Sequence, residues 1–341
     1  MRYKLLGKSG LRVSELALGT MTFGEEWGWG ASKEECHAMF DAFAEAGGNF
    51  VDTANRYTEG TSEKLVGEFT AADRDHFVVA TKYTLFTRRD DPNAAGNQRK
   101  NMVQSLEASL KRLGTGYVDL YWVHAWDFVT PIEEVMRGLD DLVRAGKILY
   151  IGISDTPAWI VSRANMLAEL RGWSQFVGLQ VRYSLLDRAG ERDLLPMARA
   201  LDIGVTAWGA LGTGILTGKY NKNPAEKGRA GIWNSVDARS LAVAEEVTQV
   251  AAEIGRSPSQ VALNWVRQQP GVVIPILGSR KLAQIQDNLA CVDFKLTEAQ
   301  MQRLQDVSKI DLGFPHDFLA SDEVQDLVSG GTFEKMDRHR G

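Results

Sequence analysis

The stretch Val118-Asp119-Leu120-Tyr121-Trp122-Val123-His124 is a mostly apolar run that ends in an ionisable residue. Two earlier runs, Phe50-Val51-Asp52 and Phe77-Val78-Val79-Ala80-Thr81-Lys82, end in the same way. If these runs are buried parallel strands, the three ionisable residues stand at the same end of one sheet. Burying an ionisable group costs several kcal/mol unless it is paired or neutralised. Their shared position therefore indicates a functional site rather than packing.

The rest of the chain repeats this strand pattern at spacings typical of βα units. Apolar runs end at Gly19, Asp52, Lys82, His124, Ser154, Gln180, Trp208 and about Gly278. Amphipathic helix patterns follow at 33–46, 62–69, 98–113, 131–145, 157–170 and 192–201, and again at 241–254 and 257–268. This alternation predicts an α/β protein of the (β/α)8 or TIM-barrel type. A doubly wound open sheet would need a glycine fingerprint after the first strand, and residues 18–24 do not supply one.

Size and composition predict a single domain over residues 1–341. The chain is 44% hydrophobic, enough for a large core. Residues 1–13 read as a hairpin that plugs the barrel floor, and extra helices are expected after the seventh strand and at the C-terminus. We expect a loop from 211 to about 238 and a C-terminal tail over about 309–341.

Several classes of function are disfavoured by the composition. A net charge of −5 argues weakly against nucleic acid as a partner. Two cysteines are too few and too far apart for a disulfide framework or a metal site. An apolar segment of signal-peptide or membrane-spanning length is not found, so we expect a cytoplasmic protein. The sequence says nothing about the oligomeric state.

A fourth chemical group belongs with the three strand ends. Tyr57 lies five residues beyond Asp52, close enough to share the loop after that strand. A carboxylate, an ammonium group, a phenol and an imidazole at one barrel mouth make a set suited to proton transfer.

The motifs around these residues resemble one family. They are Asp52-Thr53-Ala54, Tyr57, Gly60-x-Ser62-Glu63, Ala80-Thr81-Lys82, the run 117–124 and Gly152-Ile153-Ser154. Together they are similar to the aldo-keto reductases, in particular the subgroup with bacterial NADPH-dependent reductases and potassium-channel β-subunits, over about 4–288. The resemblance implies a (β/α)8 barrel that reduces aldehydes and ketones with NADPH.

The resemblance also implies roles for the four groups. Tyr57 is the general acid, Lys82 its electrostatic neighbour, Asp52 the partner of Lys82, and His124 the group that orients the carbonyl. A free phenol has a pKa of about 10, and a nearby ammonium group is expected to lower it toward the working pH.

A larger set of residues is implied to hold the cofactor. The set is Gly19, Thr20, Met21, Asp52, Ser154, Asp155, Gln180, Trp208, Gly209, Leu211, Gly212, Gly214, Lys219, Gly278, Ser279, Arg280, Gln284 and Asn288. Trp208 is expected to stack on the nicotinamide, and Ser279 with Arg280 to meet the 2′-phosphate of NADPH. Asp155 departs from the family, because many members carry Asn there. Arg182 likewise stands where members often carry Glu.

The substrate is defined only as a small carbonyl compound. The aromatic residues Trp27, Trp29, Phe86 and Trp126 are expected to wall a pocket, together with the tail around 314–318. Two other functions remain open at this stage. One is a regulatory NADPH-binding subunit, disfavoured because the barrel begins close to Met1. The other is a Schiff-base lyase with Lys82 as nucleophile, disfavoured because Asp52 would raise the pKa of that lysine.

Overall fold

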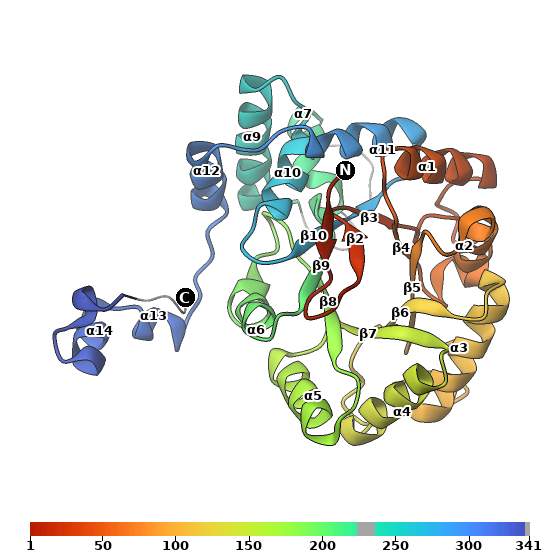
Figure 1. Cartoon of the computed structure of the whole chain (residues 1–341). Helices are drawn as coiled ribbons and strands as arrows, with labels where there is room; N and C mark the ends of the chain where they lie inside the picture. The colour runs from red at the N-terminus through yellow and green to blue at the C-terminus, as the bar shows by residue number, and fades with distance from the viewer. Residues whose placement is uncertain (224–235, 338–341) are drawn as a thin grey trace.

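A computed structural model describes residues 1–223 and 236–337 of the chain. Eight parallel strands form a closed barrel in which the last strand pairs with the first. The strands are β3 (Ala17–Gly19), β4 (Phe50–Asp52), β5 (Val78–Tyr83), β6 (Val118–Val123), β7 (Ile148–Ser154), β8 (Phe176–Arg182), β9 (Gly204–Trp208) and β10 (Val273–Gly278). Figure 1 shows this ring with helices around it. The predicted (β/α)8 fold is confirmed.

The helices cover the outside of the barrel. They are α1 (Lys33–Glu45), α2 (Thr61–Thr70), α3 (Arg99–Leu113), α4 (Ile132–Arg144), α5 (Ala158–Arg171), α6 (Leu194–Ala200), α9 (Ala238–Glu253), α10 (Pro258–Arg267), α11 (Leu282–Leu289) and α12 (Glu298–Ser308). Local chemistry sets several of their ends. The Ser32 side chain caps α1 by accepting from the Glu35 amide, and Gly114 ends α3 at a φ of 64°, a conformation that favours glycine. Within the described ranges, the helices are all too short or too polar to cross a membrane.

The floor of the barrel is closed by the predicted N-terminal hairpin. Strands β1 (Tyr3–Leu5) and β2 (Arg12–Ser14) pair antiparallel. Leu6 and Val13 beside them are fully buried and join an interior cluster that includes Leu120 and Trp122. The Lys8 amide also donates to the Asp202 carbonyl at 2.6 Å, just before β9. The hairpin therefore plugs the end of the barrel opposite the strand carboxyl ends.

The segment after β9 differs from the expected loop. It contains a 3-10 turn, η4 (Gly212–Thr217), and the short helix α7 (Lys219–Lys222), whereas residues 224–235 of the expected loop lie outside the described ranges. Ile215 and Leu216 are fully buried. Two buried aliphatic residues explain why this stretch folds back on the barrel instead of running free.

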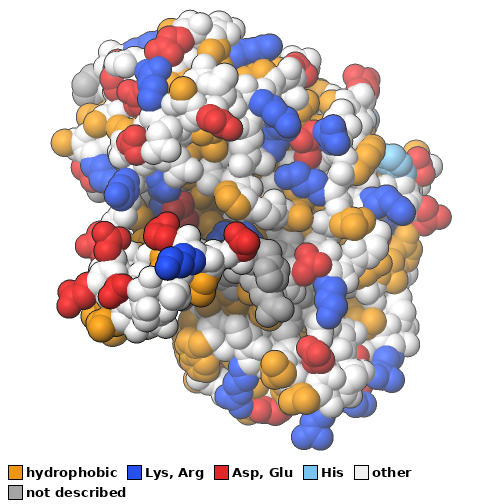
Figure 2. All heavy atoms as spheres, turned by 60° about the vertical axis from the view of Figure 1, so that its left-hand side comes forward, with side chains coloured by type: hydrophobic (Ala, Val, Ile, Leu, Met, Phe, Trp, Pro, Cys, Tyr) orange, Lys and Arg blue, Asp and Glu red, His pale blue; other side chains and the backbone are white. Residues whose placement is uncertain are grey.

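The C-terminal tail stands at the side of the barrel (Figure 1). It holds α13 (His316–Leu319), α14 (Asp322–Ser329) and the 3-10 turn η6 (Phe333–Lys335). Figure 2, which turns this side forward, shows charged and apolar side chains interspersed over the surface. Phe314 is 84% exposed and packs on Phe318 at a ring distance of 6.0 Å. The expected pocket wall around 314–318 is therefore not formed, because these rings pack on each other in solvent.

Candidate active site

Four predicted residues meet at the carboxyl ends of β4, β5 and β6. The Lys82 ammonium donates to Asp52 Oδ2 at 2.5 Å and to Tyr57 Oη at 3.2 Å. The Tyr57 ring stands edge-on to the His124 ring, with 5.9 Å between centroids. The structure thus brings together an acid, a cation, a phenol and an imidazole from three strand ends and one turn.

Lys82 carries its charge in a fully buried position. Its ammonium also donates to the Thr53 carbonyl at 2.8 Å, so three oxygens surround it. Burial by itself lowers the pKa of Lys82, but Asp52 and Tyr57 outweigh it and the net pKa is raised. A Schiff-base nucleophile needs a depressed pKa, so this environment disfavours a lyase that uses Lys82.

The pKa of Tyr57 shifts in the direction opposite to the one expected from the sequence. Burial is the largest influence and raises the pKa of the Tyr57 phenol, while Lys82 acts to lower it and Asp52 acts to raise it. The net direction is upward, so the expected net lowering was wrong. The reason is that dehydration of the phenolate outweighs the attraction of the ammonium group. At neutral pH Tyr57 holds its proton and can donate it.

His124 is held neutral beside this pair. Burial, and then the Lys82 charge, place the pKa of the imidazole well below 6.5. Its Nδ1 has no hydrogen-bond partner among the described residues. A neutral imidazole offers one donor and one acceptor nitrogen, which suits it to hold a polar ligand atom.

Strained backbone is concentrated around the same mouth. Four residues other than glycine adopt positive φ close to the site, namely Thr58 (45°), Glu59 (54°), Thr84 (103°) and Asp155 (42°). The Thr58 hydroxyl donates to the Phe23 carbonyl at 2.6 Å, which fixes the turn that carries Tyr57. Strain of this kind costs about 1–3 kcal/mol per residue and is typical of functional sites.

The hydroxyl of Ser62 ties the start of α2, just after the turn that carries Tyr57, to two strands. It shares hydrogen bonds of 2.8 Å with the hydroxyls of both Thr20 and Thr53, which follow β3 and β4. The Thr20 hydroxyl also donates to the Asp52 carbonyl at 3.0 Å, so its hydrogen bonds are made to other groups of the protein. Sequence reasoning marked Ser62 as a motif residue but did not give it this role, because its partners are distant in sequence.

Glu63 makes a second support that the sequence did not reveal. Its carboxylate is fully buried and accepts from the Thr81 hydroxyl and from Arg112 Nε, both at 2.5 Å. Thr81 directly precedes Lys82 on β5. A buried acidic residue in the motif was the available signal, but the arginine that pairs with it lies 49 positions away.

The residues expected around a carboxamide lie side by side at the ends of β7, β8 and β9. Ser154 is buried, and its hydroxyl has no partner in the part of the chain that the structure describes. Gln180 Nε2 donates to Asp52 Oδ1 at 3.0 Å. Asp155 accepts from the Trp208 indole at 3.1 Å. Dehydration by the surrounding walls raises the pKa of Asp155, although Trp208 acts to lower it.

The loop after β9 is a glycine-rich turn. Gly209, Gly212 and Gly214 have φ values of 70°, 53° and 93°. Gly212, Thr213 and Gly214 are consecutive residues with positive φ, and the amides of Gly212 and Gly214 donate to the carbonyls of Gly209 and Leu211 at 2.8 and 2.9 Å. Leu211 is half-buried and precedes the turn η4, and a Cβ on Gly214 would stand 3.6 Å from Lys219 Cε. The loop is thus closed on itself by its own backbone hydrogen bonds, and its contact with a pyrophosphate stays a prediction.

The residues from β10 into α11 form a second polar group. The Arg280 amide donates to Gln284 Oε1 at 3.0 Å, and Asn288 Nδ2 donates to Ser279 Oγ at 3.4 Å. The Arg280 side chain is exposed and makes no ion pair or side-chain hydrogen bond among the described residues. Gly278, also exposed, ends the strand beside it.

Gly19 and Met21, which were expected at the cofactor, lie at and just after the end of β3. A Cβ on Gly19 would lie 2.5 Å from Ile276 Cγ2, so only glycine fits where β3 meets β10. Met21 follows in a turn and is half-buried.

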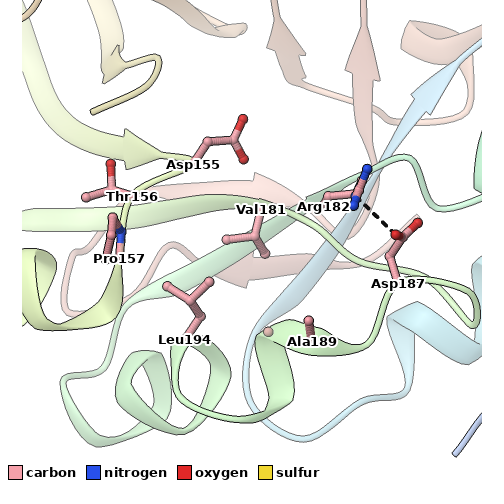
Figure 3. Close-up of a pocket in the computed structure, with 9 residues that line it drawn as sticks. Asp155, Thr156, Pro157, Val181, Arg182, Asp187, Ala189 and Leu194 are labelled. Atoms are coloured by element: carbon pink, nitrogen blue, oxygen red, sulfur yellow. Dashed lines mark ion pairs between the residues drawn. The ribbon is translucent and has the colours of Figure 1, made fainter. Parts of the chain in front are cut away.

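The four aromatic residues expected in the substrate pocket lie in three different environments. Trp27 and Trp29 pack on each other with 5.5 Å between centroids. Phe86 lies between two guanidinium groups, and Trp126 packs against the main core. A cleft of about 310 Å³ opens between the ends of β7 and β8 (Figure 3), and none of these four residues lines it.

The site as a whole fits a nicotinamide dinucleotide. The unpartnered Ser154 hydroxyl, the partly exposed Trp208 and the exposed Arg280 supply what a carboxamide, a flat ring and a phosphate require.

Comparisons with known proteins agree with the family resemblance of the motifs. A model described as "Aldo/keto reductase family" matches residues 15–309. Norsolorinic acid reductase B of Dothistroma septosporum is 40% identical, over 94% of this chain and 85% of the relative. Aryl-alcohol dehydrogenase [NADP(+)] of Phanerodontia chrysosporium is 38% identical, over 90% of this chain and 86% of the relative. The chain belongs to the aldo/keto reductase family.

Proposed function

We propose that this protein reduces the carbonyl group of an aromatic aldehyde or ketone to an alcohol, with NADPH as cofactor. The observation that carries the proposal is the position of the Lys82 ammonium, 2.5 Å from Asp52 Oδ2 and 3.2 Å from Tyr57 Oη. A phenol with a charged, anchored ammonium group beside it is built to give up a proton and to have the resulting phenolate stabilised.

The division of labour follows from the charges at the mouth. Bound NADPH would supply the hydride. The carbonyl oxygen gains negative charge during reduction, and Tyr57 donates a proton to it. His124, neutral at working pH, orients the same oxygen, while Lys82 stabilises the phenolate left on Tyr57. These contacts strengthen as charge develops, so they stabilise the transition state more than the ground state.

The aromatic substrate class is supported by relatives and by the mouth itself. By its name, the aryl-alcohol dehydrogenase [NADP(+)] of Phanerodontia chrysosporium acts on aryl alcohols, which are the products of reducing aromatic carbonyl compounds. The packed pair Trp27 and Trp29 on the loop after β3 offers flat apolar surface to a ring.

Removing the hydroxyl of Tyr57 by substitution tests the proposed function. Tyr57→Phe should lower the rate of reduction by about 10² to 10⁴-fold, because general acid catalysis contributes that much. The dissociation constant for NADPH should remain nearly unchanged, because the hydroxyl acts on the transferred proton. The rate is measured as NADPH consumption with a panel of substituted benzaldehydes, and binding by calorimetry.

Tyr117→Phe is the matched control, since that hydroxyl bonds Asp75 on the surface, away from the mouth. Its rate should equal the wild-type rate. If Tyr57→Phe kept most of the wild-type activity, the proposed role of Tyr57 would be refuted.

The preference for NADPH over NADH rests on Arg280. An unpaired, exposed guanidinium beside Ser279 can form a forked, charge-assisted contact with a 2′-phosphate. Arg280→Ala should weaken NADPH binding by about 1.5 kcal/mol, the lower end of the range for such a bond because the position is exposed to solvent.

NADH binding should not change in the same variant, because NADH lacks that phosphate. Arg171→Ala, at the exposed end of α5, should alter neither affinity. Both dissociation constants are measured by calorimetry. Equal losses for the two cofactors would show that Arg280 does not contact the 2′-phosphate.

A further inference from the structure

Arg182 stands at the border between the barrel mouth and the cleft of about 310 Å³. Figure 3 shows Arg182 and Asp187 together at one end of this cleft, with Asp155 and Thr156 at the other. Arg182 Nε and Asp187 Oδ1 form an ion pair of 3.1 Å. The charged residues that line the cleft therefore lie on both sides of the carboxyl end of β8, the strand that pairs with β9.

The Trp208 indole is held on its edge and on one face by these groups. Its Nε1 donates to Asp155 Oδ1 at 3.1 Å. The Arg182 guanidinium carbon lies over the ring, 5.7 Å from its centroid. The strand register makes Arg182 and Trp208 direct partners across β8 and β9. In the described residues no other cation and no other ring lies over Trp208, so a single face of the indole is covered in this way.

Arg182 is itself fixed, although its side chain is 45% exposed. Asp187, its ion-pair partner, is only 17% exposed and sits in a tight turn. The Asp187 amide donates to the Ser184 carbonyl at 3.1 Å, and Ser184 is fully buried. The anchor of Arg182 is thus part of the packed protein.

We propose that Arg182 is a positioning residue, which together with Asp187 and Asp155 holds the Trp208 ring in one orientation and leaves its opposite face for the nicotinamide. The last part of this statement rests on the proposed function, in which Trp208 stacks on the cofactor. The orientation itself is a property of the free protein and is tested without any ligand.

The first measurement follows Trp208 in the free protein. The chain has nine tryptophans, which are replaced by 5-fluorotryptophan for ¹⁹F NMR, and the Trp208 resonance is assigned from its loss in Trp208→Phe. In Arg182→Met and in Asp187→Asn this resonance should shift or broaden. Arg182→Lys should restore most of the wild-type line, because a lysine keeps a cation over the ring.

The second measurement concerns the cofactor. NADP⁺ binding by calorimetry should weaken about two- to fivefold in Arg182→Met, the size of an exposed cation–π contact. The KM for NADPH should rise by the same factor while kcat at saturation stays unchanged, since Arg182 acts through Trp208. Arg163→Met, a surface arginine paired with Glu133 on another helix, is the matched control and should change nothing.

The outcomes separate the two proposals. A Trp208 resonance in Arg182→Met identical to wild type would overturn the positioning role, whatever the affinities. A shifted resonance with weaker NADP⁺ binding and unchanged kcat supports it. If wild-type protein bound no NADP⁺ at all, the proposed function would fail, and the NMR comparison would still decide whether Arg182 orients the ring.

Discussion

Lys82→Met tests the buried ion pair. The variant leaves the Asp52 carboxylate without its cation, which typically costs about 3–5 kcal/mol of unfolding free energy. It also removes a charge that lowers the pKa of Tyr57, so that pKa rises further. Alcohol oxidation needs the phenolate, and its onset should therefore move to higher pH. Urea unfolding measures the first effect and the pH dependence of oxidation the second.

The double variant Asp52→Asn with Lys82→Met separates these two effects. Without a buried charge of either sign, most of the lost stability should return. Part of the shift in pH dependence should remain, because the lost Lys82 charge acts on the pKa of Tyr57 more strongly than the lost Asp52 charge does. Because the pKa of Lys82 is raised in the folded protein, its charged form stabilises the wild-type fold fully at pH values below the 10.5 of a free lysine, and this contribution is lost only as pH rises through the folded pKa. A stability difference between wild type and the single variant that vanished at pH 7 would contradict this account.

The meeting of Asp52, Lys82 and His124 at one mouth could be predicted from the sequence, because each follows an apolar run. The direction of the Tyr57 pKa shift could not, because it depends on how dry the phenol is once the barrel closes. The contact of Asp155 with Trp208 could not be predicted either, since it joins two positions 53 residues apart.

At the level of elements, apolar runs located all eight strands, with ends that differ by two residues or fewer from those expected. The reason is that a parallel strand stays buried until it leaves the core at its carboxyl end. Spacing could not reveal how the strands pack inside. Trp122 fills the barrel between Gly152 and Gly178, and its indole would collide with a Cβ at either position.

Gly152→Ala tests this interior layer. The new Cβ would stand 2.3 Å from Trp122 Cε3, and Trp122 is fully buried. Forcing an atom into a filled core costs about 1–3 kcal/mol of unfolding free energy. Gly116→Ala, where a Cβ meets nothing within 4 Å, is the control and should change stability by no more than about 0.5 kcal/mol. Urea denaturation of both variants gives the comparison, and equal stabilities would mean that β7 can move away from the indole.

At the scale of the whole molecule, the barrel, the hairpin and the late helices followed from the sequence, but the place of the tail did not. Phe314 and Phe318 suggested a wall for the mouth, yet the tail that carries them stands at the side of the barrel (Figure 1) and both rings are exposed. The Arg192 guanidinium donates to the Asp311 carbonyl at 2.8 Å just before this tail, a contact between remote segments that periodicity does not reveal.

The hairpin under the barrel gives the two ends of the molecule unequal freedom to change. The end below the strands is closed by the buried residues Leu6 and Val13, so a substitution there disturbs the core itself. The loops at the other end are joined across strands, as where the Thr58 hydroxyl donates to the Phe23 carbonyl and the Trp208 indole donates to Asp155. A protein engineer who exchanges one of these loops must therefore keep such contacts, because losing them frees a neighbouring loop as well.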